Sequence, residues 1–153
     1  MESGTAPPDF GFGSEETFIQ LSDLRLIYRV LLAFCPNGFD AGCLKGIHAA
    51  SDEWEGFQDR EMVAILVSAA PPDELIEFAE KEDVPFVLVS DEDNVVTSLY
   101  GADGSQEPIV YLLGKDGMVK KVWVGWPANS EIFDLVDTML LRQQEIQERS
   151  EAA

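Results

Sequence analysis

The chain has 153 residues, of which 46% are hydrophobic, and it carries 29 acidic against 10 basic side chains. This length and apolar content are typical of one folded domain with its own core. The formal net charge of −19 excludes nucleic acids and anionic membranes as expected partners, and no apolar run reaches membrane-spanning length.

The composition along the chain predicts an N-terminal arm over residues 1–17, a folded domain over 18–148 and a frayed acidic tail over 149–153. The arm is rich in Gly, Pro and Ser, and a short helical turn is expected at Ser22-Asp23. Residues 29–35 form a continuous apolar run, which is typical of a strand buried on both faces.

A helix is predicted from about Ala41 to Gln58, because apolar residues recur there every three to four positions. Later elements are expected as a strand over 62–68, a helix from Pro71 to about Glu82, a strand over 86–89, a helix over 93–100, strands over 109–113 and 118–124 joined by the Gly114–Gly117 turn, and a helix from Asn129 or Ser130 to about Gln147. This order predicts a three-layer α/β domain with a mixed central sheet and helices on both faces, and such sheets place sites at the carboxyl ends of strands.

Cys43 is the strongest candidate for chemistry, because it falls where the helix after the first buried strand begins. A thiol at a helix start lies beside unpaired backbone N–H groups and the positive end of the helix dipole, which favour the nucleophilic thiolate. The alternative is that Cys43 is a small buried residue of the core. Its position in a strand–loop–helix segment favours the reactive interpretation.

The remaining sequence motifs exclude several other kinds of site. Two cysteines, Cys35 and Cys43, and the single histidine His48 cannot supply a four-ligand Cys/His metal site, and neither a metal nor a cofactor is expected. A Ser/His/Asp triad using His48 would lack a nucleophile elbow, and no glycine loop has the spacing that cradles phosphate.

The acidic residues are scattered along the chain and lysines are few. This pattern favours adaptation to high salt, where counterions screen the repulsion between carboxylates. The alternative is that the acidity attracts a basic partner. On this composition we expect a halophilic protein. We also expect it to be cytoplasmic, because the N-terminus has no basic region followed by a long apolar stretch.

Several segments together carry a family resemblance that covers most of the chain. They are Ala6–Phe10 (APPDF), Leu21–Leu24 (LSDL), Phe34–Cys43 (FCPNGFDAGC), Phe78–Lys81 (FAEK), Val89–Asp91 (VSD) and Tyr111–Gly117 (YLLGKDG). In this set and order, the chain resembles the peroxiredoxin branch of the thioredoxin superfamily, in particular the AhpC/TSA and bacterioferritin-comigratory type found in halophilic archaea.

The resemblance implies a thioredoxin-like fold and a thiol peroxidase that reduces hydrogen peroxide or alkyl hydroperoxides. Cys43 falls on the peroxidatic cysteine, and Pro36 on the proline that shapes the loop before it. The thiolate would attack a peroxide oxygen and become a sulfenic acid. A second thiol would then condense with it, and a thioredoxin-like or low-molecular-weight thiol would restore the reduced enzyme.

The chain departs from the family pattern at two positions that normally support the thiolate. Asp40 stands in place of the usual Thr or Ser, and a carboxylate beside Cys43 would raise the thiol pKa by like-charge repulsion. The place of the usual arginine holds Pro108, a position similar to that of the cis-proline that faces the redox cysteine in thioredoxin-type domains.

The second thiol of the cycle has two interpretations. Many relatives carry a resolving cysteine five residues after the peroxidatic one, but that position is His48, which we interpret as a surface or core-edge residue rather than a catalytic one. In the first interpretation, Cys35 is the resolving thiol within the chain. In the second, Cys35 is a core residue and an external thiol reacts with the sulfenic acid of Cys43.

Three functions therefore stay open from the sequence: a thiol peroxidase, a catalytically degenerate redoxin acting as a redox sensor or binding module, and a thiol–disulfide oxidoreductase using both cysteines. Trp123 and Trp126 are expected to pack on the last helix, and a homodimer contact through Trp126 is the alternative.

Overall fold

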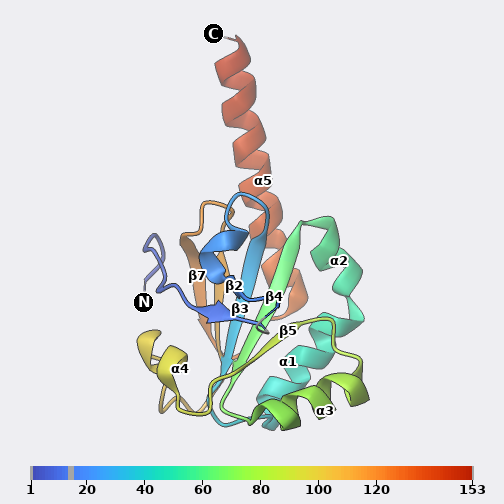
Figure 1. The fold of residues 1–153 in the computed structure, drawn as a ribbon. Coiled ribbons are helices and arrows are strands. Elements are labelled where there is room, and N and C mark those ends of the chain that lie inside the picture. Colours follow the sequence, from blue (N-terminus) through green and yellow to red (C-terminus); the bar gives the residue numbers. More distant parts are fainter. Residues whose placement is uncertain (1, 14–15, 153) are drawn as a thin grey trace.

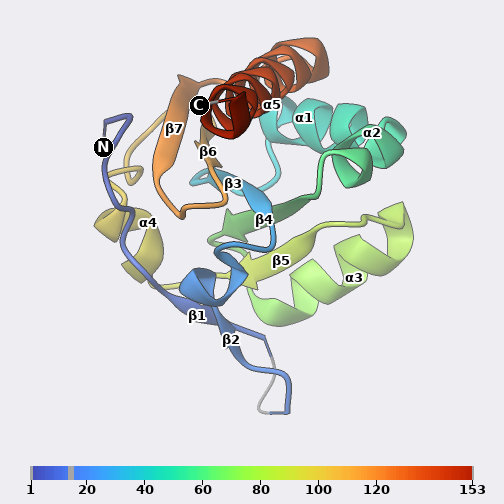
Figure 2. The same cartoon turned by 90° about the horizontal axis from the view of Figure 1, so that it is seen from above.

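The computed structural model describes residues 2–13 and 16–152. Its centre is a five-stranded sheet with the strand order β5-β4-β3-β6-β7 (Figures 1 and 2). β3 pairs in parallel with β4, and β4 with β5, whereas β6 pairs antiparallel with both β3 and β7. The strands are β3 (Arg29–Cys35), β4 (Met62–Ser68), β5 (Val87–Ser90), β6 (Ile109–Leu113) and β7 (Val119–Val124).

Helices cover both faces of this sheet, as Figure 2 shows. They are α1 (Ala41–Asp52), α2 (Trp54–Asp59), α3 (Pro72–Glu82), α4 (Val95–Leu99) and α5 (Asn129–Ala152), and a 3₁₀ turn, η1, spans Leu21–Leu24. α1, α2 and α5 lie on one face, and α4, η1 and the N-terminal segment lie on the other. The predicted three-layer α/β class with a mixed sheet is thus confirmed.

Strand β3 connects the two halves of the core, because its side chains alternate between the two faces. Leu31, Ala33 and Cys35 belong to the core under α1 and α5, whereas Val30, Leu32 and Phe34 belong to the core on the opposite face. All seven residues of the strand are buried, including Arg29 at its start, and the burial of the six apolar residues 30–35 is what a continuous apolar run in a central strand predicts. This alternation decides which helix Cys35 faces.

The structure differs from the predicted elements in three places. The helix expected over 41–58 is divided at Glu53 into α1 and α2, and within α2 the rings of Trp54 and Phe57 stack with a centroid distance of 5.5 Å. The last helix continues beyond Gln147 to Ala152. In addition, β1 (Gly11–Phe12) pairs with β2 (Ile19–Gln20), a contact between strands too short to show a sequence period.

The segment predicted as an N-terminal arm contributes to the core. Phe10 and Phe12 are buried on the face of the sheet that α4 covers, and the Tyr100 hydroxyl donates a hydrogen bond to the Pro8 carbonyl. Burial raises the pKa of Tyr100, so this hydroxyl stays a donor at physiological pH. Among the described residues, no helix combines the length and apolarity needed to cross a bilayer.

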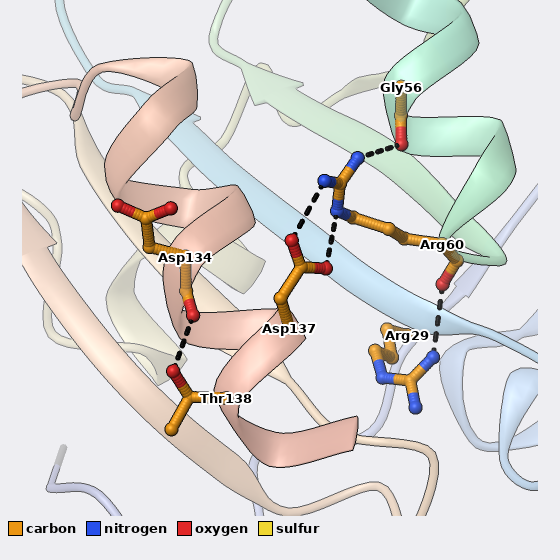
Figure 3. A network of polar contacts seen from close by, with 6 residues as sticks. All are labelled: Arg29, Gly56, Arg60, Asp134, Asp137 and Thr138. Carbon is orange, nitrogen blue, oxygen red and sulfur yellow. Dashed lines mark hydrogen bonds and ion pairs between the residues drawn. The ribbon is translucent and has the colours of Figure 1, made fainter. Parts of the chain in front are cut away.

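Arg60 ties the end of α2 to α5 (Figure 3). Its Nε and Nη2 donate to the two carboxylate oxygens of Asp137, both at 2.9 Å, and its Nη1 donates to the Gly56 carbonyl at 2.8 Å. The guanidinium also lies 4.1 Å from the ring centre of Phe133. The hydrogen bond from Arg60 lowers the pKa of Asp137 below its ordinary value.

We expect Arg60→Met to lower the free energy of unfolding by about 1–2 kcal/mol at neutral pH, because the bidentate pair and the cation–π contact are both lost. The pKa of Asp137 is lower in the folded than in the unfolded state. The contribution of the pair is therefore present above the unfolded pKa and is lost as the pH falls through the folded one. Denaturant titrations across the acidic pH range measure the free energy of unfolding of wild type and variant. A difference between the two free energies that does not become smaller in acid would contradict the expectation.

Candidate redox site: a disulfide between strand β3 and helix α1

The two cysteines of the chain are joined to each other. Cys35 is the last residue of β3, Cys43 is the third residue of α1, and a disulfide links them with a Cα–Cα distance of 6.2 Å. The pairing follows from the fold, because Cys35 faces the side of the sheet that α1 covers. Both residues are at most 2% exposed. The structure is therefore the oxidised form, in which Cys43 is a buried half-cystine rather than an accessible thiolate.

The loop between the cysteines is held at two further points. It begins with a turn at Pro36, in which the Gly38 N–H donates to the Cys35 carbonyl. The Asn37 side-chain amide donates to the carbonyls of Ser105 at 3.1 Å and Gln106 at 3.3 Å, just before β6. On the other side of the loop, the Phe39 ring stacks on Phe78 of α3 with a centroid distance of 4.1 Å.

Asp40 is the N-cap of α1. Its Oδ1 accepts a hydrogen bond from the Cys43 backbone N–H at 2.9 Å, so the carboxylate occupies one of the unpaired amides at the start of the helix. Aspartate is a good capping residue, and its negative charge suits the positive end of the helix dipole. The cap therefore stabilises α1 and places a negative charge within three residues of the Cys43 sulfur.

Pro108 lies over the first turn of α1. A methyl group placed on Gly42 would lie 3.6 Å from Pro108 Cδ, which is ordinary van der Waals contact. The peptide bond before Pro108 is trans, so it differs from the cis-proline of thioredoxin-type domains to which we compared it. Pro108 therefore occupies the expected neighbourhood, with the usual backbone geometry.

No arginine of the described chain stands in the place of the one that the family normally supplies. Arg29 begins β3, six residues from Cys35, which separates the two by about 20 Å along the strand. Its Nη1 donates to the Arg60 carbonyl at 3.0 Å (Figure 3), and the Arg60 side chain is engaged by Asp137. Arg25 lies against Gly117 in the β6–β7 turn. Arg142 and Arg149 belong to the exposed end of α5.

His48 lies on the outer surface of α1. Its Nε2 is 3.3 Å from the Glu82 carboxylate of α3, and its side chain is 52% exposed. This matches the interpretation of His48 as a surface residue. The tryptophan expectation is met only in part: Trp123 Nε1 donates to Glu131 of α5 at 2.9 Å, whereas the Trp126 ring covers Gly46 of α1.

The residues that hold the loop from outside were not predicted from the sequence. Asn37, Phe39 and Phe78 contact partners that lie between 39 and 69 residues away in the chain. The Asn after Pro36 was readable as a turn residue, but no local pattern reveals a partner so distant in sequence. The contact between Trp126 and α1 was not predicted; the signal that could have indicated it is Gly46, whose missing side chain leaves room for the ring.

The bond between Cys35 and Cys43 is also expected to stabilise the fold. Reduction should lower the free energy of unfolding by about 2–3 kcal/mol, because a cross-link over eight residues restricts the unfolded chain. Thermal unfolding with and without a phosphine reductant measures the effect. A variant with both cysteines replaced by serine is the control, since its Tm should not respond to the reductant; an unchanged wild-type Tm would contradict the expectation.

Comparison with known proteins shows which family the chain belongs to. The AhpC/TSA family matches residues 4–122. Peroxiredoxin Bcp of Escherichia coli strain K12 is 26% identical over 134 residues, which cover 80% of this chain and 85% of that protein. Peroxiredoxin Q of Sedum lineare chloroplasts is 30% identical over 131 residues, 80% of this chain and 69% of that protein.

The solved structures lead to the same fold. The crystal structure of peroxidoxin BcpB from Mycobacterium tuberculosis superposes with a TM-score of 0.78 at 21% identity, over 90% of this chain and 97% of that one. The family model spans both cysteines, the loop between them and the central sheet as far as Val122 of β7. The chain therefore belongs to the AhpC/TSA family, as the resemblance of its sequence to peroxiredoxins predicted.

Proposed function

We propose that this protein is a thiol peroxidase in which Cys43 reacts with the peroxide and Cys35 is the resolving thiol. The observation that carries the proposal is the Cys35–Cys43 disulfide, the product that such a cycle leaves behind. The relatives named peroxiredoxins support the peroxidase activity.

The cycle begins with the reduced protein. The Cys43 thiolate attacks one peroxide oxygen, the O–O bond breaks, and the leaving oxygen takes a proton to become water or an alcohol. Cys43 is then a sulfenic acid. The Cys35 thiolate attacks its sulfur, hydroxide leaves and is protonated to water, and the disulfide forms. Two thiols of a thioredoxin-like protein or of small molecules return two electrons and two protons.

The geometry supports resolution without disassembly of the helix. In the oxidised form Cys43 still belongs to α1, Asp40 still caps it, and the two Cα atoms are within the normal range for a disulfide. The attack of Cys35 on the Cys43 sulfenic acid therefore needs the side chains and the loop at Pro36–Asp40 to move, while α1 remains helical.

The peroxide step needs an opening, because both cysteines are buried in the oxidised form. The loop that separates them offers it, since its contacts from outside, among the described residues, are the Asn37 hydrogen bonds and the Phe39–Phe78 stack. Negative charge that develops on the leaving oxygen would meet the N-terminal end of α1 rather than a guanidinium.

A stopped-flow experiment tests this function. Fully reduced protein is mixed with one equivalent of hydrogen peroxide or of tert-butyl hydroperoxide, and tryptophan fluorescence is followed. We expect oxidation faster than that of free cysteine at the same pH, and a product that mass spectrometry identifies as the intramolecular disulfide. Cys43→Ser is the control. A wild-type rate no greater than that of free cysteine would exclude a peroxidase.

A thiol–disulfide oxidoreductase is the second candidate, and the observations that favour it are the internal disulfide and Asp40 in place of a hydroxyl residue. This activity requires exchange with protein dithiols but no fast peroxide step. Reduction of insulin disulfides by the reduced protein, together with a peroxide rate equal to that of free cysteine, would favour it over the peroxidase.

A further inference from the structure

The antiparallel ladder between β3 and β6 stops just before the disulfide. Its last pair is Phe34 with Ile109. One step further, the same register sets Cys35 opposite Pro108, and a proline has no N–H group to donate to a ladder. Pro36, which follows Cys35, lacks one as well. Among the described residues, no backbone hydrogen bond joins the chain after β3 to the chain before β6.

Side-chain hydrogen bonds from Asn37 take the place of these missing ladder bonds. The Gly38 N–H donates to the Cys35 carbonyl at 3.1 Å, which closes a turn whose third residue is Asn37. The register of β3 and β6, extended by three steps, sets Asn37 opposite Gln106. Its Nδ2 donates to the Gln106 carbonyl at 3.3 Å and to the Ser105 carbonyl at 3.1 Å. We name these two hydrogen bonds the Asn37 clamp.

The segment that the Asn37 clamp reaches, residues 105–108, also contacts the helix that carries the second cysteine. Pro108, its last residue, lies against the first turn of α1, where a methyl group on Gly42 would be 3.6 Å from Pro108 Cδ. The Pro108 carbonyl accepts a hydrogen bond from the Gly125 N–H at 2.7 Å, which fixes the segment to the chain after β7. The chain on both sides of the disulfide, at Asn37 and at Gly42, is therefore held against one short segment.

The Asn37 clamp and the disulfide hold the same loop closed. Each favours the other, because closing the loop once removes chain entropy that the second contact would otherwise have to overcome. In the oxidised protein the Cys35–Cys43 bond keeps the loop closed and the clamp formed. In the reduced protein the clamp has to form without that bond. Loss of the clamp should therefore destabilise the oxidised form more than the reduced form.

We propose that Asn37 is a positioning residue for disulfide formation, because its clamp keeps Cys43 within reach of Cys35 after peroxide has reacted. The inference rests on the proposed function and adds a residue to it. In this step the Cys35 thiolate attacks the sulfur of the Cys43 sulfenic acid, an S–S bond forms, the S–O bond breaks, and the leaving hydroxide takes a proton to become water. The clamp also slows the entry of peroxide, because both cysteines are buried while the loop is closed.

The equilibrium between dithiol and disulfide tests the Asn37 clamp without any peroxide. Protein is equilibrated with mixtures of reduced and oxidised dithiothreitol, free thiols are blocked with a maleimide, and mass spectrometry measures the fraction of each form. At half oxidation, we expect Asn37→Ala to need a ratio of oxidised to reduced dithiothreitol about five times that of the wild type, the effect of one ordinary hydrogen bond. This change corresponds to a reduction potential about 20 mV less negative.

Two further variants separate the role of the amide donors from a loss of stability. Asn37→Asp keeps the size of the side chain, but a carboxylate cannot donate, so we expect the result of Asn37→Ala. Asn94→Ala changes the same residue type before α4, where the side chain makes no capping hydrogen bond and a φ of 56° disfavours alanine. It should lower the Tm and leave the dithiothreitol ratio unchanged. A wild-type ratio in either Asn37 variant, or an equal shift in Asn94→Ala, would overturn the proposal.

The two steps of the peroxide reaction give a second readout, with different expectations for each step. When reduced protein is mixed with increasing hydrogen peroxide, the phase that accelerates with peroxide reports oxidation of Cys43, and the phase that does not reports disulfide formation. We expect Asn37→Ala to form the disulfide about fivefold more slowly and to be oxidised no more slowly than the wild type. Slower oxidation with unchanged disulfide formation would overturn the positioning role. A wild type without a peroxide-dependent phase would contradict the proposed function, and the dithiothreitol equilibrium would still decide the role of Asn37.

Discussion

Serine in place of Cys35 should stop the peroxidase cycle after its first chemical step. The variant keeps Cys43, so we expect it to consume one equivalent of peroxide at a rate similar to that of the wild type. It lacks the thiol that closes the disulfide, so Cys43 should accumulate as a sulfenic acid. Mass spectrometry after addition of dimedone measures that species directly.

The reciprocal change is expected to remove the reaction altogether. Cys43→Ser leaves Cys35 as the last residue of the buried strand β3, outside the helix whose first turn carries Cys43. Peroxide consumption should fall to that of an ordinary buried thiol. The assignment of roles would be reversed if Cys43→Ser formed the sulfenic acid and Cys35→Ser did not. Full turnover of Cys35→Ser would show that an external thiol resolves the intermediate.

Asp40→Thr should accelerate the peroxide step by about tenfold, the second-largest effect that we expect. The carboxylate beside Cys43 opposes ionisation of the reduced thiol and offers no donor to the peroxide when ionised. Threonine retains an oxygen that can cap α1, removes the charge and adds a hydroxyl donor. The rate constant with hydrogen peroxide and the pH dependence of thiolate absorbance measure the two consequences.

Asp40→Asn separates charge from hydrogen bonding. Its amide oxygen can still accept the Cys43 N–H, so α1 stays capped, but it adds no hydroxyl. We expect the pKa of the Cys43 thiol to be lower in Asp40→Asn and Asp40→Thr than in the wild type. The rate constant with hydrogen peroxide should be larger in Asp40→Thr than in Asp40→Asn. A thiol pKa that is the same in wild type and Asp40→Asn would show that the carboxylate does not act on Cys43 through its charge.

The backbone of the site was predictable from the sequence because its signals are local. The apolar run at Arg29–Cys35 gave a buried strand with the observed bounds, and the position of Cys43 gave a helix start. The role of Asp40 was less accessible. Compared with the family pattern, Asp40 only replaces the Thr or Ser hydroxyl, whereas in the structure its carboxylate is also the cap of α1.

The side-chain environment was not predictable to the same degree, because it depends on contacts between distant segments. The sequence did not determine whether Cys35 pairs with Cys43. The alternation of side chains along β3 puts Cys35 on one face of the sheet, but only the structure shows that α1 covers this face. The division of the helix at Glu53 and the cover of Gly46 by Trp126 likewise depend on packing. Neither has a periodic signal in the chain.

The last helix has a practical consequence for work with this protein. Residues 141–151 of α5 are all exposed, and Figure 1 shows this part of the helix extending away from the body, beyond the end of the sheet opposite the start of α1. A tag, a surface linker or a fluorescent fusion partner attached at the carboxyl terminus would therefore stand clear of the cysteines. Immobilised in this way, the molecule would present its reactive end outward to solutes and to other proteins.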